Sequence, residues 1–509
     1  MDLAHRFSAT YRNLARTSTE HFLVTPVTAL PTGKETGKFL SIDVGGTNLR
    51  VGFIELTGEK NEPAQDQPAR SSTVDENVFA HIKRSHDKNW PIGDHLKMDQ
   101  AEDLFTWIGD CIAEVVRDAL EEQAALDNVT SPLGDEIPLG ITFSFPMAQT
   151  SISEATLLPM GKGFAITSDL NLGKMLLDGY APHCEDLQPD SNASQPQKLP
   201  RIRVAAITND TVATFASLAY AVKAAPNSRV AMGLIVGTGT NATVPMKVEH
   251  LHPEKQKALS NSGASGTVVI NTEWTIKGTD KPLVDLNIKT RWDAMLDADS
   301  DAPGFQPFEY MTSGRYLGEI VRLVFVDAIV LEQDEALPPS LLAKNALPTR
   351  FLSEVVARKG GRIVQGELER KYPDCDPPGG PFWTVERVEL IRDIAEAVQL
   401  RSSALVAAAC VGLLACVGDL GIDGALQAGR ASNASRARGK HGVEELVIAY
   451  TGGTISQYPK WLLSCQQWID TLVEEGSAAN AAKRVTLKEA LDGGIIGAGV
   501  LAGMTNEMI

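Results

Sequence analysis

The sequence predicts an α/β protein built from two related halves around a cleft. Three apolar, strand-like segments each end in a glycine-containing turn, at 40–47, 233–241 and 446–454. Helical patterns lie between them, and the second half of the chain is rich in alanine and leucine. Strands that alternate with helices are typical of the α/β class. The recurring strand and turn indicates two halves of similar construction.

The first half begins with apolar residues at loosely helical spacing, which predicts a surface helix within 1–30 and then a turn at Pro31-Thr32-Gly33. Two apolar runs flank Gly45-Gly46, so we expect a β-hairpin over 38–57. The same criteria predict the other elements of this half: a loop at 58–70, an amphipathic helix at 99–125, a buried strand at 138–146 and a flexible insertion at 187–200.

The second half is predicted in the same way. A buried strand at 202–209 has Asp210 at its end, and a helix follows over 211–224. The remaining expected elements are a strand with a glycine turn at 230–241, a loop at 249–265, a helical region from Phe308 to Val326, helices near 339–359 and 385–418, a loop at 431–442, a strand at 446–450 with a turn at 451–454, and a last helix after Gly493-Gly494.

Length, charge and cysteine content narrow the possible classes of protein. The chain has 509 residues, enough for two or more hydrophobic cores, and its formal net charge of −17 argues against a nucleic-acid or anionic-membrane surface. The six cysteines form no C-x-x-C pair, which indicates reduced thiols, and the N-terminus lacks the apolar core of a secretory signal. The longest apolar run, 404–417, is shorter than the roughly 20 residues of a membrane span. We therefore expect a cytoplasmic protein without a membrane span.

The tip of the predicted hairpin has the chemistry of a nucleotide site. Gly45 and Gly46 let backbone N–H groups approach an anion without an intervening Cβ. Thr47 adds a hydroxyl donor, and Arg50 adds a fixed positive charge. Asp43 lies where a carboxylate could hold Mg²⁺ through water. This is not a Walker loop, because the segment contains no G-x-x-x-x-G-K-[ST] pattern.

Four short blocks carry the remaining chemistry, although a single glycine turn or Asn-Asp-Thr is often only a turn or a helix N-cap. The blocks are Asp43 with Gly45-Gly46-Thr47, Phe143-Ser144-Phe145-Pro146 with Gly161-Lys162-Gly163-Phe164, Asn209-Asp210-Thr211, and Gly237-Thr238-Gly239-Thr240-Asn241. In this order and at these spacings they closely resemble the eukaryotic hexokinase family, including its fungal-type hexokinases, glucokinases and N-acetylglucosamine kinases. Asn271-Thr272-Glu273-Trp274, the segment 303–309 and the segment 313–319 match that family in the same order, and the likeness runs from about residue 38 to the C-terminus.

The resemblance implies an actin-like ATPase (ribonuclease H-like) fold with two domains. The small domain would comprise 38–207 and 493–509, and the large domain would comprise 1–37 and 208–492. In that family the two domains close on the sugar, and ATP lies across the cleft between them. Closure of this kind would expel water and protect ATP from hydrolysis.

The resemblance also implies the reaction and the residues that perform it. The chain would use ATP to phosphorylate the 6-hydroxyl of a hexose, with Asp210 as the general base and Lys162 offsetting charge on the transferring phosphoryl group. Neighbouring Trp274 and Phe308 argue against a purely solvent-exposed role for the adjacent acids. The expected sugar-binding residues are Ser144, Phe145, Lys162, Asn209, Asp210, Asn241, Glu273, Gln306 and Glu309.

The expected nucleotide site combines the hairpin tip with two more glycine turns. Its predicted residues are Asp43, Gly45, Gly46, Thr47, Asn48, Arg50, Gly237, Thr238, Gly239, Gly452, Gly453 and Thr454. Mg²⁺ would arrive with ATP and would have no direct protein ligand, with Asp43 and Asp210 holding it through water.

The chain departs from the family pattern near the sugar. Gly161 stands where the family usually has Thr, Phe305-Gln306 where it has Gln-Gln, and Tyr310 where a lysine is common. Losing a threonine side chain and gaining an aromatic ring would reshape the pocket. One hypothesis is a bulkier sugar such as N-acetylglucosamine, to which some fungal-type members are dedicated. The other is weakened phosphorylation of glucose.

The adenosine side departs further from the family. The family's Asp-Gly-Ser turn is Gly452-Gly453-Thr454 here, its Gly-Ser-Gly is replaced within 492–495, and its Ile-Glu-x-Asp is replaced at 355–358. We expect these changes to reduce ATP affinity, and restoring Asp-Gly-Ser at 452–454 to lower KM for ATP. Asp43, Lys162 and Asp210 are retained, which favours an active kinase. The alternative is a sugar-sensing regulatory protein that turns over poorly.

Overall fold

The computed structural model divides the chain into two units, each assembled from several segments. Unit 1 comprises Met1–Phe22, Leu234–Ala258 and Thr272–Glu489, and unit 2 comprises Leu23–Gly233, Leu259–Asn271 and Ala490–Ile509. The predicted domain boundaries remain a prediction. The structure describes residues 1–58, 81–93, 95–96, 101–125, 133–144, 147–157, 170–184, 198–222, 227–261, 266–332, 337–373, 381–422 and 443–506.

Unit 2 contains a five-stranded sheet with the predicted hairpin inside it. The hairpin consists of β2 (Thr36–Val44) and β3 (Asn48–Thr57), which are antiparallel and pair Asp43 with Arg50. The sheet order is β4-β3-β2-β5-β8, with β4 at Ile82–Pro91, β5 at Glu136–Phe143 and β8 at Arg201–Thr208. Because β2, β5 and β8 run parallel, their carboxyl ends meet at one edge of the sheet. The edge where parallel strands end is a common place for ligands.

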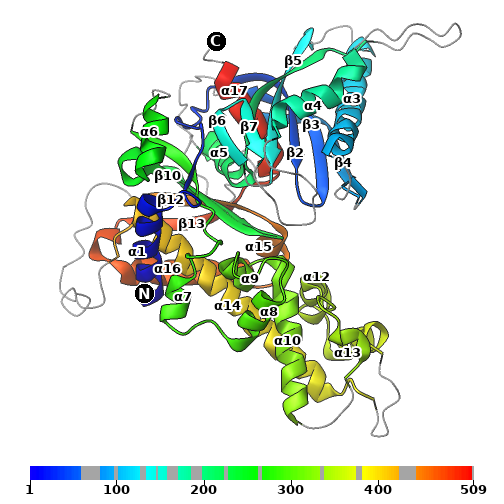
Figure 1. The fold of residues 1–509 in the computed structure, drawn as a ribbon, viewed down its shortest axis with the longest axis vertical. Helices are drawn as coiled ribbons and strands as arrows, with labels where there is room; N and C mark the ends of the chain where they lie inside the picture. The colour runs from blue at the N-terminus through cyan, green and yellow to red at the C-terminus, as the bar shows by residue number, and fades with distance from the viewer. Residues whose placement is uncertain are drawn as a thin grey trace, which may run out of the picture. The chain divides into compact units, whose positions relative to one another are not determined.

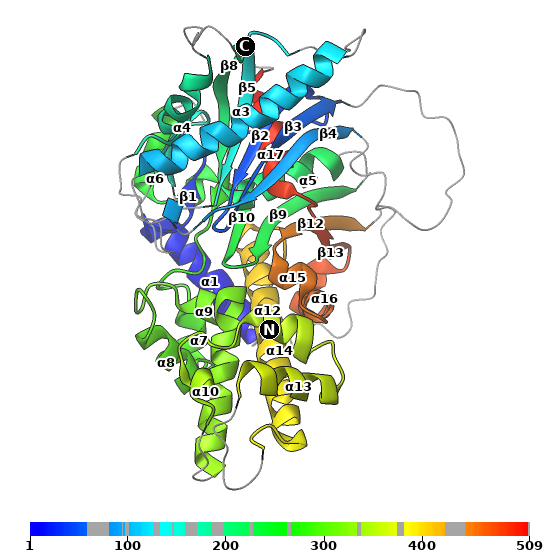
Figure 2. The same ribbon diagram turned by 90° about the vertical axis from the view of Figure 1, so that its right-hand side faces the viewer.

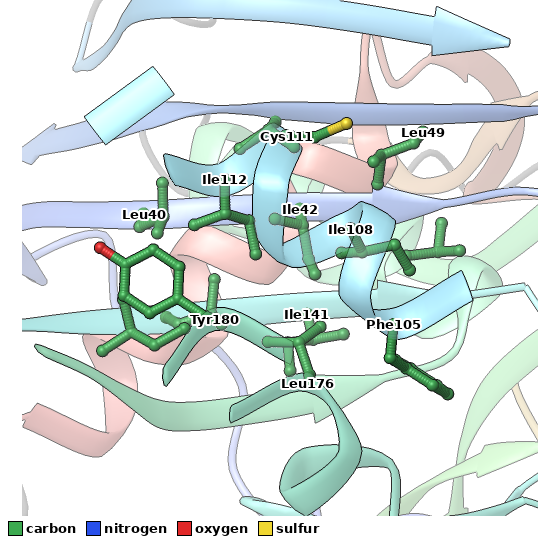
Figure 3. Packing of buried hydrophobic residues seen from close by; sticks show 14 of the residues in the cluster. Leu40, Ile42, Leu49, Phe105, Ile108, Cys111, Ile112, Ile141, Leu176 and Tyr180 are labelled. Atoms are coloured by element: carbon green, nitrogen blue, oxygen red, sulfur yellow. The ribbon is translucent and has the colours of Figure 1, made fainter. Parts of the chain in front are cut away.

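The strand β2 alternates between two environments. Leu40, Ile42 and Val44 face the hydrophobic core beneath α3 (Ala101–Ala125) and α4 (Leu172–Tyr180). Figure 3 shows Ile108 and Ile112 of α3 packing in this core. Successive side chains of a strand point to opposite faces, so Ser41 and Asp43 point the other way, toward α17 (Gly493–Asn506). The alternation places an acid on the face that carries α17.

Glycines let α17 lie very close to its neighbours in unit 2. The helix packs against β2, β3, β5 and β8 and against α5 (Asp210–Val222); α17 is the red helix in Figures 1 and 2. A Cβ at Gly497 would lie 2.0 Å from the carbonyl oxygen of Ala213, so a side chain there would force the two helices apart.

The smaller elements of unit 2 are β1 (Leu23–Val24), which pairs with β11 (Thr267–Asn271), the hairpin of β6 (Met147–Ser151) and β7 (Glu154–Leu157), and a 3₁₀ turn at Ala181–Cys184.

Unit 1 combines strands with a long central helix. The strand order is β10-β9-β12-β13, and the strands are β9 (Ser228–Val236, which enters unit 1 at Leu234), β10 (Thr240–Lys247), β12 (Glu444–Thr451) and β13 (Lys483–Glu489). Helix α14 (Val385–Val417) packs against α1 (Asp2–Thr17), α10 (Gly314–Glu332) and α16 (Trp461–Gly476). In the described part of the chain α14 is long and apolar enough to cross a membrane, but 78% of its most apolar window is buried inside the protein. It is therefore packed as a core helix.

The remaining helices are short. They are α6 (Pro253–Asn261), α7 (Lys281–Asp285), α8 (Arg291–Ala298), α9 (Pro307–Thr312), α11 (Pro339–Leu342), α12 (Thr349–Phe351), α13 (Gly361–Lys371) and α15 (Gly453–Gln457), with 3₁₀ turns at Val248–His250 and Ala478–Asn480 and a π-helical turn at Leu352–Val356. The α/β class and the main strands and helices predicted from the sequence are confirmed.

Some predictions of secondary structure were wrong. The expected loop at 249–265 contains α6, a polar helix whose start is set by Pro253 at its first position. The expected helix near 339–359 is broken into short pieces, because Asn345 has a left-handed backbone with φ of 59° and Pro348 follows. The helix expected from Phe308 to Val326 is interrupted at Ser313 and continues beyond Val326. The predicted segments 58–70, 187–200 and 431–442 lie almost entirely outside the described residues.

Candidate functional site

The predicted site residues fall into two groups, one in each unit. Unit 2 holds Asp43, Gly45, Gly46, Thr47, Asn48, Arg50, Ser144, Asn209 and Asp210, and unit 1 holds Gly237, Thr238, Gly239, Asn241, Glu273, Gln306, Glu309, Gly452, Gly453 and Thr454. Phe145, Lys162 and the neighbouring Gly161 lie outside the described residues. The two groups are described in turn.

Asn209 and Asp210 stand where β8 ends and α5 begins. The Oδ1 atom of Asn209 accepts hydrogen bonds from the Thr211 N–H at 2.8 Å and from the Thr211 hydroxyl at 2.6 Å. Asn209 is therefore the N-cap of α5 and is only 6% exposed. Asp210 is the first helical residue, is partly exposed, and its Oδ1 accepts from the same Thr211 N–H at 2.9 Å. A carboxylate at this position lies at the positive end of the helix dipole.

Asp43 lies against the start of α17. A Cβ at Gly494 would be 2.4 Å from the Oδ2 atom of Asp43, so glycine is needed for the helix to approach this carboxylate. Burial raises the pKa of Asp43 to about 7; Arg50 lowers this pKa, and Asp210 and Asp492 raise it further. Thr142, which pairs with Asp43 across β2 and β5, donates a hydrogen bond of 2.8 Å to the carbonyl oxygen of Gly494. A divalent cation beside Asp43 would favour its ionised form.

The hairpin turn beside Asp43 is held by its own backbone. The N–H of Gly45 donates to the carbonyl oxygen of Asn48 at 2.9 Å, and the Asn48 side chain donates to the Thr47 hydroxyl at 3.1 Å. A Cβ at Gly46 would meet nothing within 4 Å, so packing does not explain the absence of a side chain there. Ser144 joins the turn through its N–H, which donates to the carbonyl oxygen of Val44 at 3.0 Å. The space over Gly46 suits an anion that needs close approach to the backbone.

Arg50 has partners that sequence reasoning missed. Its Nη1 atom lies 3.0 Å from the Oδ1 atom of Asp492, and Arg84 pairs with the other oxygen of the same carboxylate. Arg84 belongs to β4, a strand that the sequence patterns did not predict. Asp492 lies in the segment 492–495, where the sequence indicated only a departure from the family pattern. Only the folded chain brings these three residues together.

In unit 1, the predicted sugar-binding acids are held by specific partners. Glu309 is 4% exposed, and its Oε2 atom accepts from the Thr240 N–H at 3.3 Å. A Cβ at Gly239 would lie 3.0 Å from this same oxygen. The Asn241 amide donates to the Oε1 atom of Glu273 at 3.3 Å. Glu273 has a left-handed backbone with φ of 46°, a conformation rare for glutamate that clusters at functional sites.

The first helix supports both acids through an aromatic cluster. Trp274 and Phe308, which neighbour Glu273 and Glu309 in sequence, are fully buried and contact each other edge to face, with ring centroids 6.0 Å apart. Tyr11 of α1 stacks on Trp274, and Phe7 of α1 contacts Phe308. The burial of Trp274 and Phe308 agrees with the argument from the sequence that the adjacent acids are not simply solvent-exposed.

A backbone hydrogen bond joins the loop that carries Gln306 to the loop that follows Glu273. The N–H of Lys277 donates to the carbonyl oxygen of Phe305 at 2.8 Å. The Phe305 ring is 44% exposed. The Tyr310 ring is buried, and its hydroxyl lies 3.1 Å from both the Ser300 hydroxyl and the Ala302 carbonyl oxygen. Of the two aromatic departures from the family, Phe305 is therefore the exposed one, and Tyr310 anchors the loop.

The two predicted glycine turns of unit 1, at 237–241 and 452–454, are joined by a hydrogen bond. The carbonyl oxygen of Gly237 accepts from the Gly314 N–H at 2.7 Å and from the Thr454 hydroxyl at 3.0 Å. Gly452 has φ of 123°, and a Cβ there would lie 2.4 Å from the Val236 carbonyl oxygen. An aspartate at 452 would therefore be strained and would clash, which argues against the benefit expected from restoring Asp-Gly-Ser at 452–454. Gly453, where a Cβ would meet nothing within 4 Å, leaves space at the start of α15.

Within the described segments, no three His, Cys, Asp or Glu side chains are grouped to bind a metal ion directly. Two carboxylates of unit 2, Asp43 and Asp210, interact electrostatically. Carboxylate oxygens suit Mg²⁺, which usually keeps several of its waters and arrives with substrate phosphates.

Comparison with known proteins gives a consistent result. Family models described as hexokinase match residues 1–220 and 231–504. Hexokinase-1 of Oryza sativa subsp. japonica is 31% identical over 499 residues, which cover 95% of this chain and 82% of the relative. A hexokinase of Schistosoma mansoni is 33% identical over 335 residues, which cover 65% of this chain and 61% of the relative.

The fold agrees with these sequence matches. The solved structure of the hexokinase from Schistosoma mansoni, complexed with glucose, matches with a TM-score of 0.71 and 26% identity, covering 99% of this chain and 94% of that one. The chain therefore belongs to the hexokinase family, has the actin-like ATPase fold and is an ATP-dependent hexose kinase.

Proposed function

We propose that Asp210 is the general base with which this hexokinase activates the 6-hydroxyl of its sugar. Its carboxylate would accept the hydroxyl proton while the sugar oxygen attacks the γ-phosphorus of ATP. The bond between that phosphorus and the β–γ bridging oxygen would break, and ADP would leave. The observation that carries this proposal is the place of Asp210, partly exposed at the first position of α5 while Asn209 performs the capping.

The phosphates would be bound by backbone amides and by Arg50. In unit 2 the open space over Gly46, the Thr47 hydroxyl and the Arg50 guanidinium lie at the same hairpin as Asp43. In unit 1 the coupled turns at 237–239 and 452–454 offer further amides. Mg²⁺ would neutralise charge on the phosphates, with Asp43 and Asp210 holding its waters. Lys162 would offset charge on the transferring group.

The sugar hydroxyls would be bound by polar groups of unit 1. Asn241, Glu273 and Glu309 present hydrogen-bonding groups whose positions are fixed by buried neighbours. Such groups discriminate against sugars that lack a matching hydroxyl, because the partner would be left buried and unpaired. Glucose, which the Schistosoma mansoni structure contains, is the first candidate substrate.

A second candidate is N-acetylglucosamine. The exposed ring of Phe305 lies on the loop that carries Gln306 and leads into α9, the helix of Glu309. The backbone of Phe305 is held in place by the N–H of Lys277. An aromatic face there could pack against an acetyl methyl group. The substitution at Gly161 is compatible with a larger sugar, because glycine removes side-chain volume. Comparing kcat/KM for glucose, mannose, fructose, glucosamine and N-acetylglucosamine decides between the candidates.

Asp210→Asn tests the proposal. It keeps the shape of the side chain and removes its ability to accept the proton, so kcat is expected to fall by about 10²- to 10⁴-fold. Sugar binding, measured by calorimetry, should change little. Asp178→Asn removes an exposed carboxylate from α4 of the same unit and serves as the control. Retention of kcat by Asp210→Asn would show that another group is the base. Absence of turnover by the unmodified enzyme on every sugar, with binding intact, would favour the regulatory alternative.

A further inference from the structure

Four charged residues of unit 2 alternate in sign along one row. Arg50 of β3 and Arg84 of β4 bind different oxygens of the Asp492 carboxylate, with Arg50 Nη1 at 3.0 Å from Oδ1. On its other side, Arg84 Nη2 lies 2.7 Å from the Oδ2 atom of Asp87. The order is therefore Asp87, Arg84, Asp492, Arg50. The resemblance to the family implies no role for Arg84 or Asp87.

The backbone of β3 makes room for this row. The pairing of β3 with β4 shifts register between Val51 and Phe53, so the strand is irregular at Gly52. A Cβ at Gly52 would lie 2.0 Å from the Oδ1 atom of Asp87. Glycine at this position therefore allows the Asp87 carboxylate to lie over β3, where it holds Arg84.

The backbone of Asp492 is held by the start of α17. Its carbonyl oxygen accepts from the Ile496 N–H at 3.0 Å, a bond in the first turn of the helix. Its backbone is left-handed, with φ of 49°, a conformation that aspartate tolerates better than most residues. Two residues later, Gly494 contacts Asp43. A carboxylate anchored in this way cannot move far, and it restrains the Arg50 side chain, which belongs to the same hairpin as Asp43.

We propose that Arg84 and Asp492 are positioning residues that hold the Arg50 guanidinium in place for the phosphates of ATP. This inference rests on the proposed function, because it assumes that Arg50 binds the nucleotide. Arg84 acts through Asp492, and Asp492 acts through Arg50. The row limits the rotamers of Arg50 before ATP arrives, so less side-chain entropy is lost on binding.

An alternative function for Asp492 is to occupy the phosphate position itself and to compete with ATP. The structure favours positioning, because Asp492 is anchored in the first turn of α17 and Arg84 is already neutralised by Asp87. The two functions predict opposite effects when the charge on Asp492 is removed. Positioning predicts weaker ATP binding, and competition predicts tighter ATP binding.

The variants are Arg84→Met, Arg84→Lys and Asp492→Asn. Asparagine tolerates the left-handed backbone at 492, so this variant removes the charge without adding strain. The side chains of Arg50, Arg84 and Asp492 are 32–43% exposed, and exposed ion pairs stabilise by at most about 1 kcal/mol, which corresponds to about fivefold in affinity. Arg84→Met and Asp492→Asn are therefore expected to raise KM for ATP about three- to fivefold, and Arg84→Lys to raise it less.

Arg203→Met is the matched control. Arg203 pairs with Glu136 at 3.2 Å and is 38% exposed, but it lies on β8 and takes no part in the row. It should leave both KM values unchanged. Binding of a non-hydrolysable ATP analogue, measured by calorimetry, reports the same effect without turnover. KM for the sugar and the melting temperature are measured alongside it.

Each outcome supports or overturns the inference. A selective rise in KM and Kd on the ATP side supports it. An unchanged KM for ATP, a lower KM for ATP in Asp492→Asn, or an equal loss of affinity for both substrates with a lower melting temperature would overturn it. If the unmodified enzyme phosphorylates no hexose, the proposed function fails, and calorimetry with the ATP analogue still tests the positioning of Arg50.

Discussion

The protonation of Asp43 gives a prediction that links stability to activity. The ordinary pKa of an aspartate is 3.8, and burial raises that of Asp43 to about 7. Below pH 3.8 the side chain is protonated in both the folded and the unfolded chain. Between 3.8 and about 7 the unfolded chain releases the proton while the folded chain keeps it, so stability falls as pH rises. Above about 7 this loss is constant.

The size of the effect follows from the same two values. Their difference corresponds to a cost of about 4 kcal/mol for ionised Asp43 as an upper limit. The Asp43 side chain keeps some exposure to solvent, and solvent screening therefore reduces this cost to about 1–3 kcal/mol. Asp43→Asn removes the ionisation, so it should stabilise the fold more at about pH 8 than at about pH 5, by about 1–2 kcal/mol. The same variant should lose activity, because the carboxylate that would hold the waters of Mg²⁺ is gone.

Urea denaturation at about pH 5 and about pH 8, without nucleotide and with a chelator present, measures this difference. Comparing the variant with the unmodified chain at each pH cancels the titration of all other groups. Asp178→Asn, which removes an exposed carboxylate from the same unit, is the control. An Asp43→Asn variant that stabilises the fold no more at the higher pH than at the lower one would refute the account of Asp43.

Three further predictions concern backbone and specificity. Gly494→Ala places a methyl group 2.4 Å from Asp43 Oδ2 and should lower kcat by roughly 10²-fold. The control is Gly366→Ala, which should leave kcat unchanged because a Cβ there meets nothing within 4 Å. Equal activity of the two variants would contradict the contact between Gly494 and Asp43. Phe305→Ala should lower kcat/KM for N-acetylglucosamine about tenfold more than for glucose, and a parallel loss for both sugars would remove Phe305 from specificity. Gly452→Asp should lower the melting temperature, because φ of 123° and the Val236 carbonyl oxygen oppose a side chain at this position. A lower KM for ATP with an unchanged melting temperature would instead support the expectation that an aspartate at 452 improves ATP binding.

Local patterns were sufficient to predict the elements that carry most of the chemistry. The hairpin of β2 and β3 follows from apolar runs on either side of two glycines, and Asp210 was correctly placed at the end of a buried strand. The pattern could not assign the capping of α5, because Asn209 and Asp210 are both good caps; the hydrogen bonds give that role to Asn209. Helix α6 was missed because its residues are mostly polar.

Contacts between distant parts of the sequence could not be predicted. Arg50 and Asp492 are separated by 442 positions, and no local pattern indicates that they pair. The support of Glu273 and Glu309 by Phe7 and Tyr11 is of the same kind, because the spacing of α1 predicts a helix and not its partner. The strain expected at 452 also depends on tertiary structure, since the Val236 carbonyl oxygen causes the clash.

The most direct test is a structure of the enzyme with a hexose and a non-hydrolysable ATP analogue bound. It should show a carboxylate oxygen of Asp210 within hydrogen-bonding distance, about 2.6–3.2 Å, of the sugar O6 atom. An Asp210 side chain that contacts neither the sugar nor a water bound to it would contradict the assignment of the general base.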